Sequence, residues 1–160
     1  MVDIHHEASC AAPVDVAFGY LDDYRTGTEW MFGLAELSPV DERDHGLGAM
    51  FDATFHVRPV KLHSRVKVTE WEQDEVLGFV SVQGFVNSST WRFRRDGAAH
   101  TTIVVRFSYE LPGGLAGRAL GRALEPIVAL SVRQSEHALR RAIETRYRDA
   151  TRRRSDDARD

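Results

Sequence analysis

The longest amphipathic segment of the chain, residues 111–148, constrains the fold most strongly. It begins at a breaker, the tetrapeptide LPGG at 111–114, after which apolar or small residues recur every three or four positions. That spacing marks one face of a helix, so the segment predicts a single long helix with its arginines largely on the outer side. The recurring residues are Leu120, Ala123, Leu124, Ile127, Ser131, Ala138, Leu139, Ala142 and Ile143.

The middle of this predicted helix carries small polar residues where large aliphatic ones are expected. Ser131 and Ser135 both fall on the predicted apolar face. Pro126 lies inside the same run and removes one backbone hydrogen bond, so it predicts a kink or a short separate helical piece near 123–125. We interpret the segment as a helix that crosses a sheet, with its small residues leaving space between the two layers.

Most of the remaining chain alternates with the period of a β-strand. Residues 2–10 predict an opening strand, and the apolar positions between Pro13 and Leu21 predict a short helix, followed by a second short helix or turn over 24–30. Further strands are predicted over 34–40, 51–57, 62–68, 76–83, 89–95 and 101–109. Arg58-Pro59 interrupts the alternation between the strands at 51–57 and 62–68. The strand at 76–83 is apolar on both alternations, so we expect it to be covered on both sides for part of its length.

Composition indicates a single globular domain. The chain has 160 residues, and 42% of them are hydrophobic and 28% charged, with a formal net charge of -3. We expect one domain over 1–148 and a polar, disordered tail over 149–160. The net charge does not favour nucleic acid as a partner, and no apolar run approaches the ~20 residues of a membrane-spanning helix. The single cysteine, Cys10, excludes an intrachain disulfide and is consistent with a cytoplasmic location.

Two short motifs resemble a known family. The run APVDVAFGYLDD at 12–23, followed by EWM at 29–31, resembles the opening of the polyketide cyclase/dehydratase-like branch of the START-like (SRPBCC) superfamily. The run YELPGGL at 109–115, placed before a long helix, is similar to the close of the same family. Together with the order of elements, the resemblance covers residues 2–147.

The resemblance implies an α+β helix-grip fold. In this fold a curved antiparallel sheet of about seven strands, with two short N-terminal helices, wraps around one long C-terminal helix and leaves an apolar cavity between them. Members bind lipids, polyketide intermediates, hormones or other apolar molecules, and some catalyse cyclisation or dehydration. The family pattern implies the cavity but no set of catalytic residues that transfers to this sequence.

A helix over a concave sheet leaves a gap that small helix residues do not fill, so we expect a cavity there. Most of the residues expected to line it are aromatic. They are Trp30, Phe51, Phe55, Val66, Phe79, Ser81, Trp91, Phe107, Tyr109, Ile127, Ser131 and Ser135. Several of the aromatic residues must also serve as core in a domain of this size. Ser64, Gln83, Asn87 and Thr90 could orient a ligand, but their alternation fits solvent-facing positions equally well.

The seven histidines do not form a metal-binding pattern. His5 and His6 are adjacent on a strand and therefore point to opposite faces, and the others are scattered. His6 and His56 are the better candidates for a general base or for hydrogen bonding to a ligand. The simpler interpretations are that His6 is a core-edge histidine satisfied by the backbone and that His56 lies on the surface. We expect no metal and no cofactor.

These patterns favour binding of an apolar or amphipathic small molecule, lipid-like or polyketide-like, between the sheet and the long helix. The main alternative is a polyketide or aromatic cyclase or dehydratase in which His6, Arg106 or Tyr109 positions an enolisable substrate and moves protons. A third is an interaction module with a solid interior, and the sequence leaves a homodimer open. The piece at 115–123 could gate the cavity, dock a partner or touch a membrane surface. No integral membrane association is expected.

Overall fold

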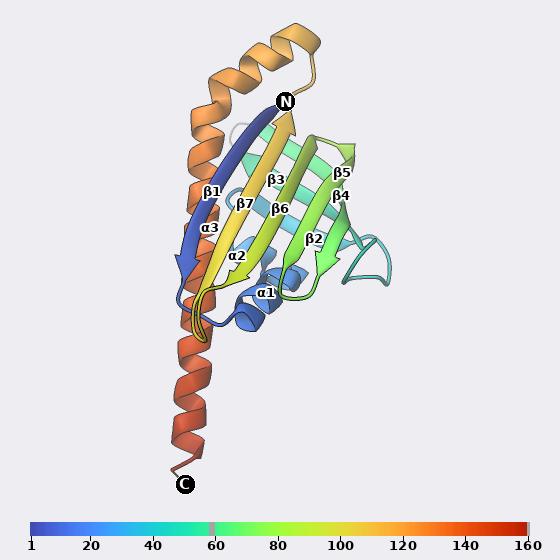
Figure 1. Ribbon diagram of the computed structural model, residues 1–160. Coiled ribbons are helices and arrows are strands. Elements are labelled where there is room, and N and C mark those ends of the chain that lie inside the picture. The colour runs from blue at the N-terminus through green and yellow to red at the C-terminus, as the bar shows by residue number, and fades with distance from the viewer. Residues whose placement is uncertain (58–59, 160) are drawn as a thin grey trace.

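The computed structural model describes residues 1–57 and 60–159, so the predicted interruption at Arg58-Pro59 lies outside the described residues. Its elements follow the predicted order, as Figure 1 shows. The strands are β1 (Val2–Cys10), β2 (Leu34–Pro39), β3 (Met50–Val57), β4 (Val60–Glu72), β5 (Val76–Gly84), β6 (Val86–Arg95) and β7 (Thr101–Glu110). The helices are α1 (Val14–Asp22), the 3-10 turn η1 (Tyr24–Thr26), α2 (Gly27–Trp30) and α3 (Gly114–Asp157).

The seven strands form one antiparallel sheet in the order β1-β7-β6-β5-β4-β3-β2. Sequence neighbours pair as hairpins from β2 to β7, and β1 closes the order by pairing with the last strand, from Val2 opposite Tyr109 to Cys10 opposite Thr101. The register shifts between β4 and β5, and again between β2 and β3. Such irregularities bend a sheet and increase its twist. The predicted α+β helix-grip architecture, with a curved sheet and a long C-terminal helix, is confirmed.

The hydrophobic core is concentrated at the end of the sheet that α1 and α2 cover. Phe18 of α1 packs edge-on against Phe93, with ring centroids 5.4 Å apart. Trp30 of α2 packs in the same way against Trp91, at 5.2 Å. Such pairs stabilise beyond the area that they bury. The two short helices therefore close one end of the curved sheet.

Strand β5 is covered on both faces for part of its length, as its sequence predicts. Its first residues, Val76 to Gly78, are buried, but Val80 and Val82 on the outer face are 40% and 53% exposed. The predicted cover on both sides is therefore limited to the start of the strand. Gly78 pairs with Glu70 of β4, whose side chain lies against it.

Helix α3 is continuous over 44 residues with Pro126 inside it. Figure 1 shows the helix bending in its N-terminal third and then running straight past the sheet. It packs mainly against β1, and also against β7, α1 and α2. The predicted disordered tail at 149–160 differs from the structure, because α3 extends to Asp157. Residues 148–159 are all exposed, and their alanines and arginines favour helix without tertiary contacts.

Candidate functional site

The inner face of the sheet is divided into a filled part and an open part. In the filled part Leu77, Trp91 and Val105 are at most 4% exposed. In the open part the inward side chains are only partly buried, and we define the open half of the sheet by Phe55, Phe79, Ser81 and Phe107. Strand register places these four residues on the same face as the core, so their exposure reflects missing cover. The open half is thus an inward-facing apolar surface.

A cluster of three polar side chains, Ser64, Ser81 and Asn87, lies at the edge of the open half. The Asn87 side-chain amide donates to Ser64 Oγ at 3.0 Å, and its backbone N–H donates to Ser81 Oγ at 3.0 Å. Because Ser81 accepts in this bond, its own hydroxyl hydrogen can donate to a ligand oxygen. The β5–β6 turn that brings the cluster together contains Gly84 at φ 82, where a Cβ would lie 2.3 Å from the His63 carbonyl oxygen.

The other two polar residues considered from the sequence lie elsewhere. Thr90 pairs with Arg106 and Gly78 on the outer face of the sheet, and Gln83 is exposed opposite Arg65. The alternation of single strands could not separate these cases. The register between strands, which depends on the bulges, decides which polar residues meet.

The helix residues expected over the cavity have separate roles. Ile127 is 57% exposed. Ser131 donates to the Ile127 carbonyl oxygen at 3.0 Å, within the helix. Ser135 is buried, and its Oγ accepts the backbone N–H of Phe32 at 2.9 Å, which ties the end of α2 to α3. The two serines on the predicted apolar face are therefore hydrogen-bonded to nearby backbone.

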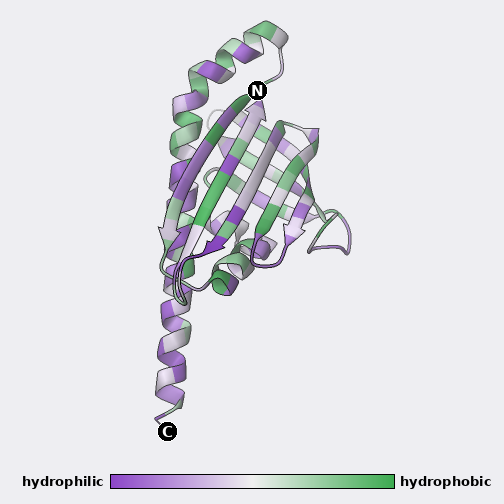
Figure 2. Ribbon diagram, in the orientation of Figure 1, coloured by the Kyte–Doolittle hydropathy of each residue, from purple (hydrophilic) through white to green (hydrophobic). Residues whose placement is uncertain are grey.

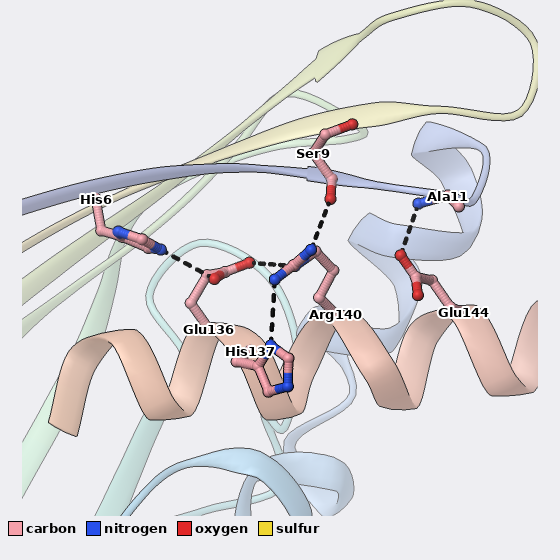
Figure 3. Close-up of polar contacts among 7 residues, drawn as sticks. All are labelled: His6, Ser9, Ala11, Glu136, His137, Arg140 and Glu144. Carbon is pink, nitrogen blue, oxygen red and sulfur yellow. Dashed lines mark hydrogen bonds and ion pairs between the residues drawn. The ribbon is translucent and has the colours of Figure 1, made fainter. Parts of the chain in front are cut away.

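A buried carboxylate joins α3 to the edge strand (Figure 3). Glu136 lies 3.0 Å from His6 Nε2 and accepts from Arg140 Nε at 2.9 Å. Its side chain is only 2% exposed, whereas those of His6 and Arg140 are 26% and 29% exposed. Arg140 also donates to the Ser9 carbonyl oxygen at 3.3 Å, and Glu144 accepts the Ala11 N–H at 2.9 Å. The partner of His6 is therefore a carboxylate rather than the predicted backbone.

Sequence reasoning identified His6 but missed Glu136. The available signal was the pair Glu136 and Arg140, four residues apart on the helix, because such spacing places opposite charges side by side. Glu136 is also three residues from the buried Leu139, so it lies on the packed face of the helix, where a carboxylate needs a hydrogen-bonding partner.

The three acid–base candidates do not come together. Tyr109 is buried, and its hydroxyl donates to the Gly121 carbonyl oxygen of α3 at 2.7 Å. Burial, and then Glu125, raise the pKa of the Tyr109 hydroxyl. His6 shares the inner face but lies four residues along β1 from the partner of Tyr109, roughly 13 Å away. Arg106 is exposed on the outer face, as is His56.

The remaining predicted ligand residues, Trp30, Phe51, Val66 and Trp91, are at most 9% exposed and belong to the hydrophobic core. One atom among them stands out. The indole Nε1–H of Trp30 is buried and has no hydrogen-bond partner within residues 1–57 and 60–159. A buried donor without a partner is energetically costly.

Two surface hollows lie outside the open half. The larger, about 720 Å³, lies between the N-terminal helices and α3 and is lined by charged residues that include Arg25, Glu29 and Arg146. There Arg146 stands over the ring of Tyr20, 5.4 Å from its centroid, and Tyr20 donates to Glu29 at 2.6 Å. The smaller, about 320 Å³, lies between the ends of β1 and β7 and the start of α3. Neither has the apolar lining that the sequence predicts for a ligand cavity.

Metal-binding clusters and membrane-spanning helices are both absent from the described part of the chain. No three His, Cys, Asp or Glu side chains within it are grouped so that they could hold a metal ion. None of the helices within that part combines the length and apolar content needed to cross a bilayer.

Comparison with known proteins gives a family and a fold. Residues 1–144 match the family described as polyketide cyclase / dehydrase and lipid transport. No curated protein sequence matches the chain.

Solved structures share the architecture at low sequence identity. A protein from Thermus thermophilus has a TM-score of 0.76 at 19% identity, covering 89% of this chain and 97% of its own. The Zhui aromatase/cyclase from Streptomyces sp. R1128 has 0.72 at 18%, covering 91% and 94%. A START superfamily protein from Mycobacterium smegmatis has 0.66 at 13%, covering 92% and 98%. At these identities the structures establish the fold.

Proposed function

Because the chain belongs to the polyketide cyclase/dehydrase and lipid transport family, we propose that it binds an apolar or amphipathic small molecule against the open half of its sheet. One observation carries the proposal. Phe55, Phe79 and Phe107 face inward with the core residues, yet they are only partly buried. An inward aromatic surface without protein cover is suited to an apolar ligand.

The driving force would be burial of apolar surface, about 25 cal/mol per Å². Orientation would come from hydrogen bonds. The Ser81 hydroxyl at the edge of the open half can donate to an oxygen of the ligand. This arrangement favours a ligand with an apolar body and a few acceptor oxygens, as lipid-like and polyketide-like molecules have.

A second candidate function is that of an aromatase, cyclase or dehydratase acting on the same ligand class. The observation that favours it is the His6–Glu136 pair, because a carboxylate that holds one imidazole nitrogen leaves the other free for proton transfer. The similar Streptomyces structure is named as an aromatase/cyclase. Catalysis would require the ligand to reach His6, whereas binding alone would not require that contact.

Native mass spectrometry of the gently purified protein, together with titration by an environment-sensitive apolar dye, tests the binding function. We expect co-purified lipid-like mass or saturable dye binding that an apolar competitor displaces. Absence of both would overturn the proposal. The second function is tested by incubating the protein with a poly-β-keto substrate mimic. Catalysis is favoured if the wild type converts the mimic and His6→Ala does not, while His6→Ala still binds the dye.

A further inference from the structure

The N-terminal third of α3 exposes a stripe of apolar side chains. Leu115, Ile127 and Leu130 are 82%, 57% and 51% exposed. With Ala119 and Ala123 they follow one another at spacings of three or four residues, so they form one face of the helix. We call these five residues the apolar stripe. Figure 2 shows hydrophobic positions recurring along this part of the helix.

The apolar stripe points away from the sheet. The residues of α3 that pack inward here are Gly117 and Gly121, and a Cβ on Gly121 would lie 3.7 Å from Val2 and 3.9 Å from Tyr109. Ala119 and Ala123 each follow a packed glycine by two residues, which is about 200° around the helix axis. A ligand against the open half of the sheet would therefore leave the stripe exposed.

Basic residues border the apolar stripe on one side. Arg118 and Arg122 lie one residue before Ala119 and Ala123, and both are exposed. Glu125 is the one acidic residue between 114 and 130, so this stretch carries two positive charges against one negative charge. An aliphatic face flanked by arginines is the pattern of a helix that lies in the interface of an anionic bilayer.

We propose that residues 115–130 of α3 bind the surface of an anionic lipid bilayer, with the apolar stripe entering the headgroup region and Arg118 and Arg122 contacting lipid phosphates. This inference goes beyond small-molecule binding, because the stripe lies outside the open half. Two observations favour a bilayer over a protein partner. The stripe consists of aliphatic and small side chains without an aromatic anchor, and the bordering charge complements anionic headgroups.

Cosedimentation of the full chain with phosphatidylcholine vesicles, with and without phosphatidylserine, tests the proposal. We expect binding that increases with phosphatidylserine. The double variant Leu115→Asp/Ile127→Asp should partition roughly tenfold or more weakly. Arg118→Gln and Arg122→Gln should each lower binding to the anionic vesicles roughly fivefold. Leu47→Asp changes a leucine that is 58% exposed in the loop before β3, and it should bind as the wild type does.

Two outcomes would overturn the proposal. One is that the wild-type chain binds neither kind of vesicle, or that the double variant binds the vesicles as well as the wild type does. The other is concentration-dependent self-association that the double variant abolishes, because the stripe would then join two copies of the chain. Dye binding at the open half should be unchanged in the double variant, so failure here is distinguishable from failure of the proposed ligand binding.

Discussion

The carboxylate of Glu136, in the middle of α3, lies 3.0 Å from the imidazole Nε2 of His6 on the edge strand β1. The two residues are 130 positions apart in the chain. Removal of one partner from such a pair leaves a buried group with fewer hydrogen bonds, and that deficit dominates the energetic effect. The pair therefore fastens the helix to the sheet edge and invites a direct measurement.

His6→Ala should lower the free energy of unfolding by about 1–3 kcal/mol, because Glu136 then keeps only Arg140 as a side-chain partner among the described residues. Urea denaturation followed by circular dichroism measures the change. His5→Ala is the matched control, since His5 is the exposed neighbour on the outer face and should change stability by less than about 0.5 kcal/mol. Equal effects of the two variants would contradict a structural role for the His6–Glu136 bond.

Gly84→Ala should be far more destabilising than Gly46→Ala. Both glycines have a left-handed backbone, at φ 82 and φ 80, so alanine costs roughly 1–2 kcal/mol for conformation at either site. At Gly84 the new Cβ would also meet the His63 carbonyl oxygen at 2.3 Å, whereas nothing in the described part of the chain lies within 4 Å at Gly46. Chemical denaturation of the two variants isolates this clash, and similar losses would show that the β5–β6 turn relaxes freely.

Phe79→Ala should weaken binding of an apolar dye about tenfold, because it removes an inward aromatic ring of the open half. Val80→Ala is the control, since Val80 is the next residue on the same strand, faces outward and is 40% exposed. Fluorescence titration gives both dissociation constants. If Val80→Ala weakens dye binding as much as Phe79→Ala does, the dye binds elsewhere.

The buried thiol of Cys10 should make the protein sensitive to alkali. Burial, with a contribution from Glu144, raises the pKa of Cys10 from 9.0 to about 12. The stabilising effect of the neutral buried thiol is complete below the pKa of the unfolded chain. It is lost as pH rises from about 9 to about 12, with a slope of up to about 1.4 kcal/mol per pH unit.

The measurement is the difference in unfolding free energy between the wild type and Cys10→Ala across this pH range. The lost packing of the sulfur shifts the two curves by a constant, whereas the thiol changes their slope. Alkaline loss from other groups, including Tyr109 with its raised pKa, is common to both proteins. Parallel curves would contradict the raised pKa of Cys10. Slow alkylation of Cys10 at neutral pH should accompany the raised pKa.

The strands, the helices and their order could be predicted because they depend on local pattern. Alternation in 51–57 and 101–109 marked β3 and β7, and the LPGG breaker marked the start of α3. The extent of α3 was underestimated, because a polar composition at 149–157 says nothing against a helix that needs no packing.

The site was harder to predict because it depends on register across long sequence separations. Ser81 and Asn87 share the polar cluster, whereas Thr90 lies on the opposite face, and this division follows from strand pairing and bulges. Glu136 lies next to His6 only because the middle of α3 packs against β1. Arg106 was grouped with His6 and Tyr109 by residue type, and the register places it on the other face.

The pairing of β1 with β7 has a consequence for synthesis of the chain. Of the seven strands in the sheet, β1 is synthesised first, but its hydrogen-bonding neighbour begins at residue 101, and its packing against α3 comes later still. Such non-local pairing slows folding, because the entropy of the intervening chain is lost before the stabilising contacts between the strands form. Strand β1 therefore lacks its sheet neighbour until β7 has been synthesised, and the sheet cannot be completed before that point.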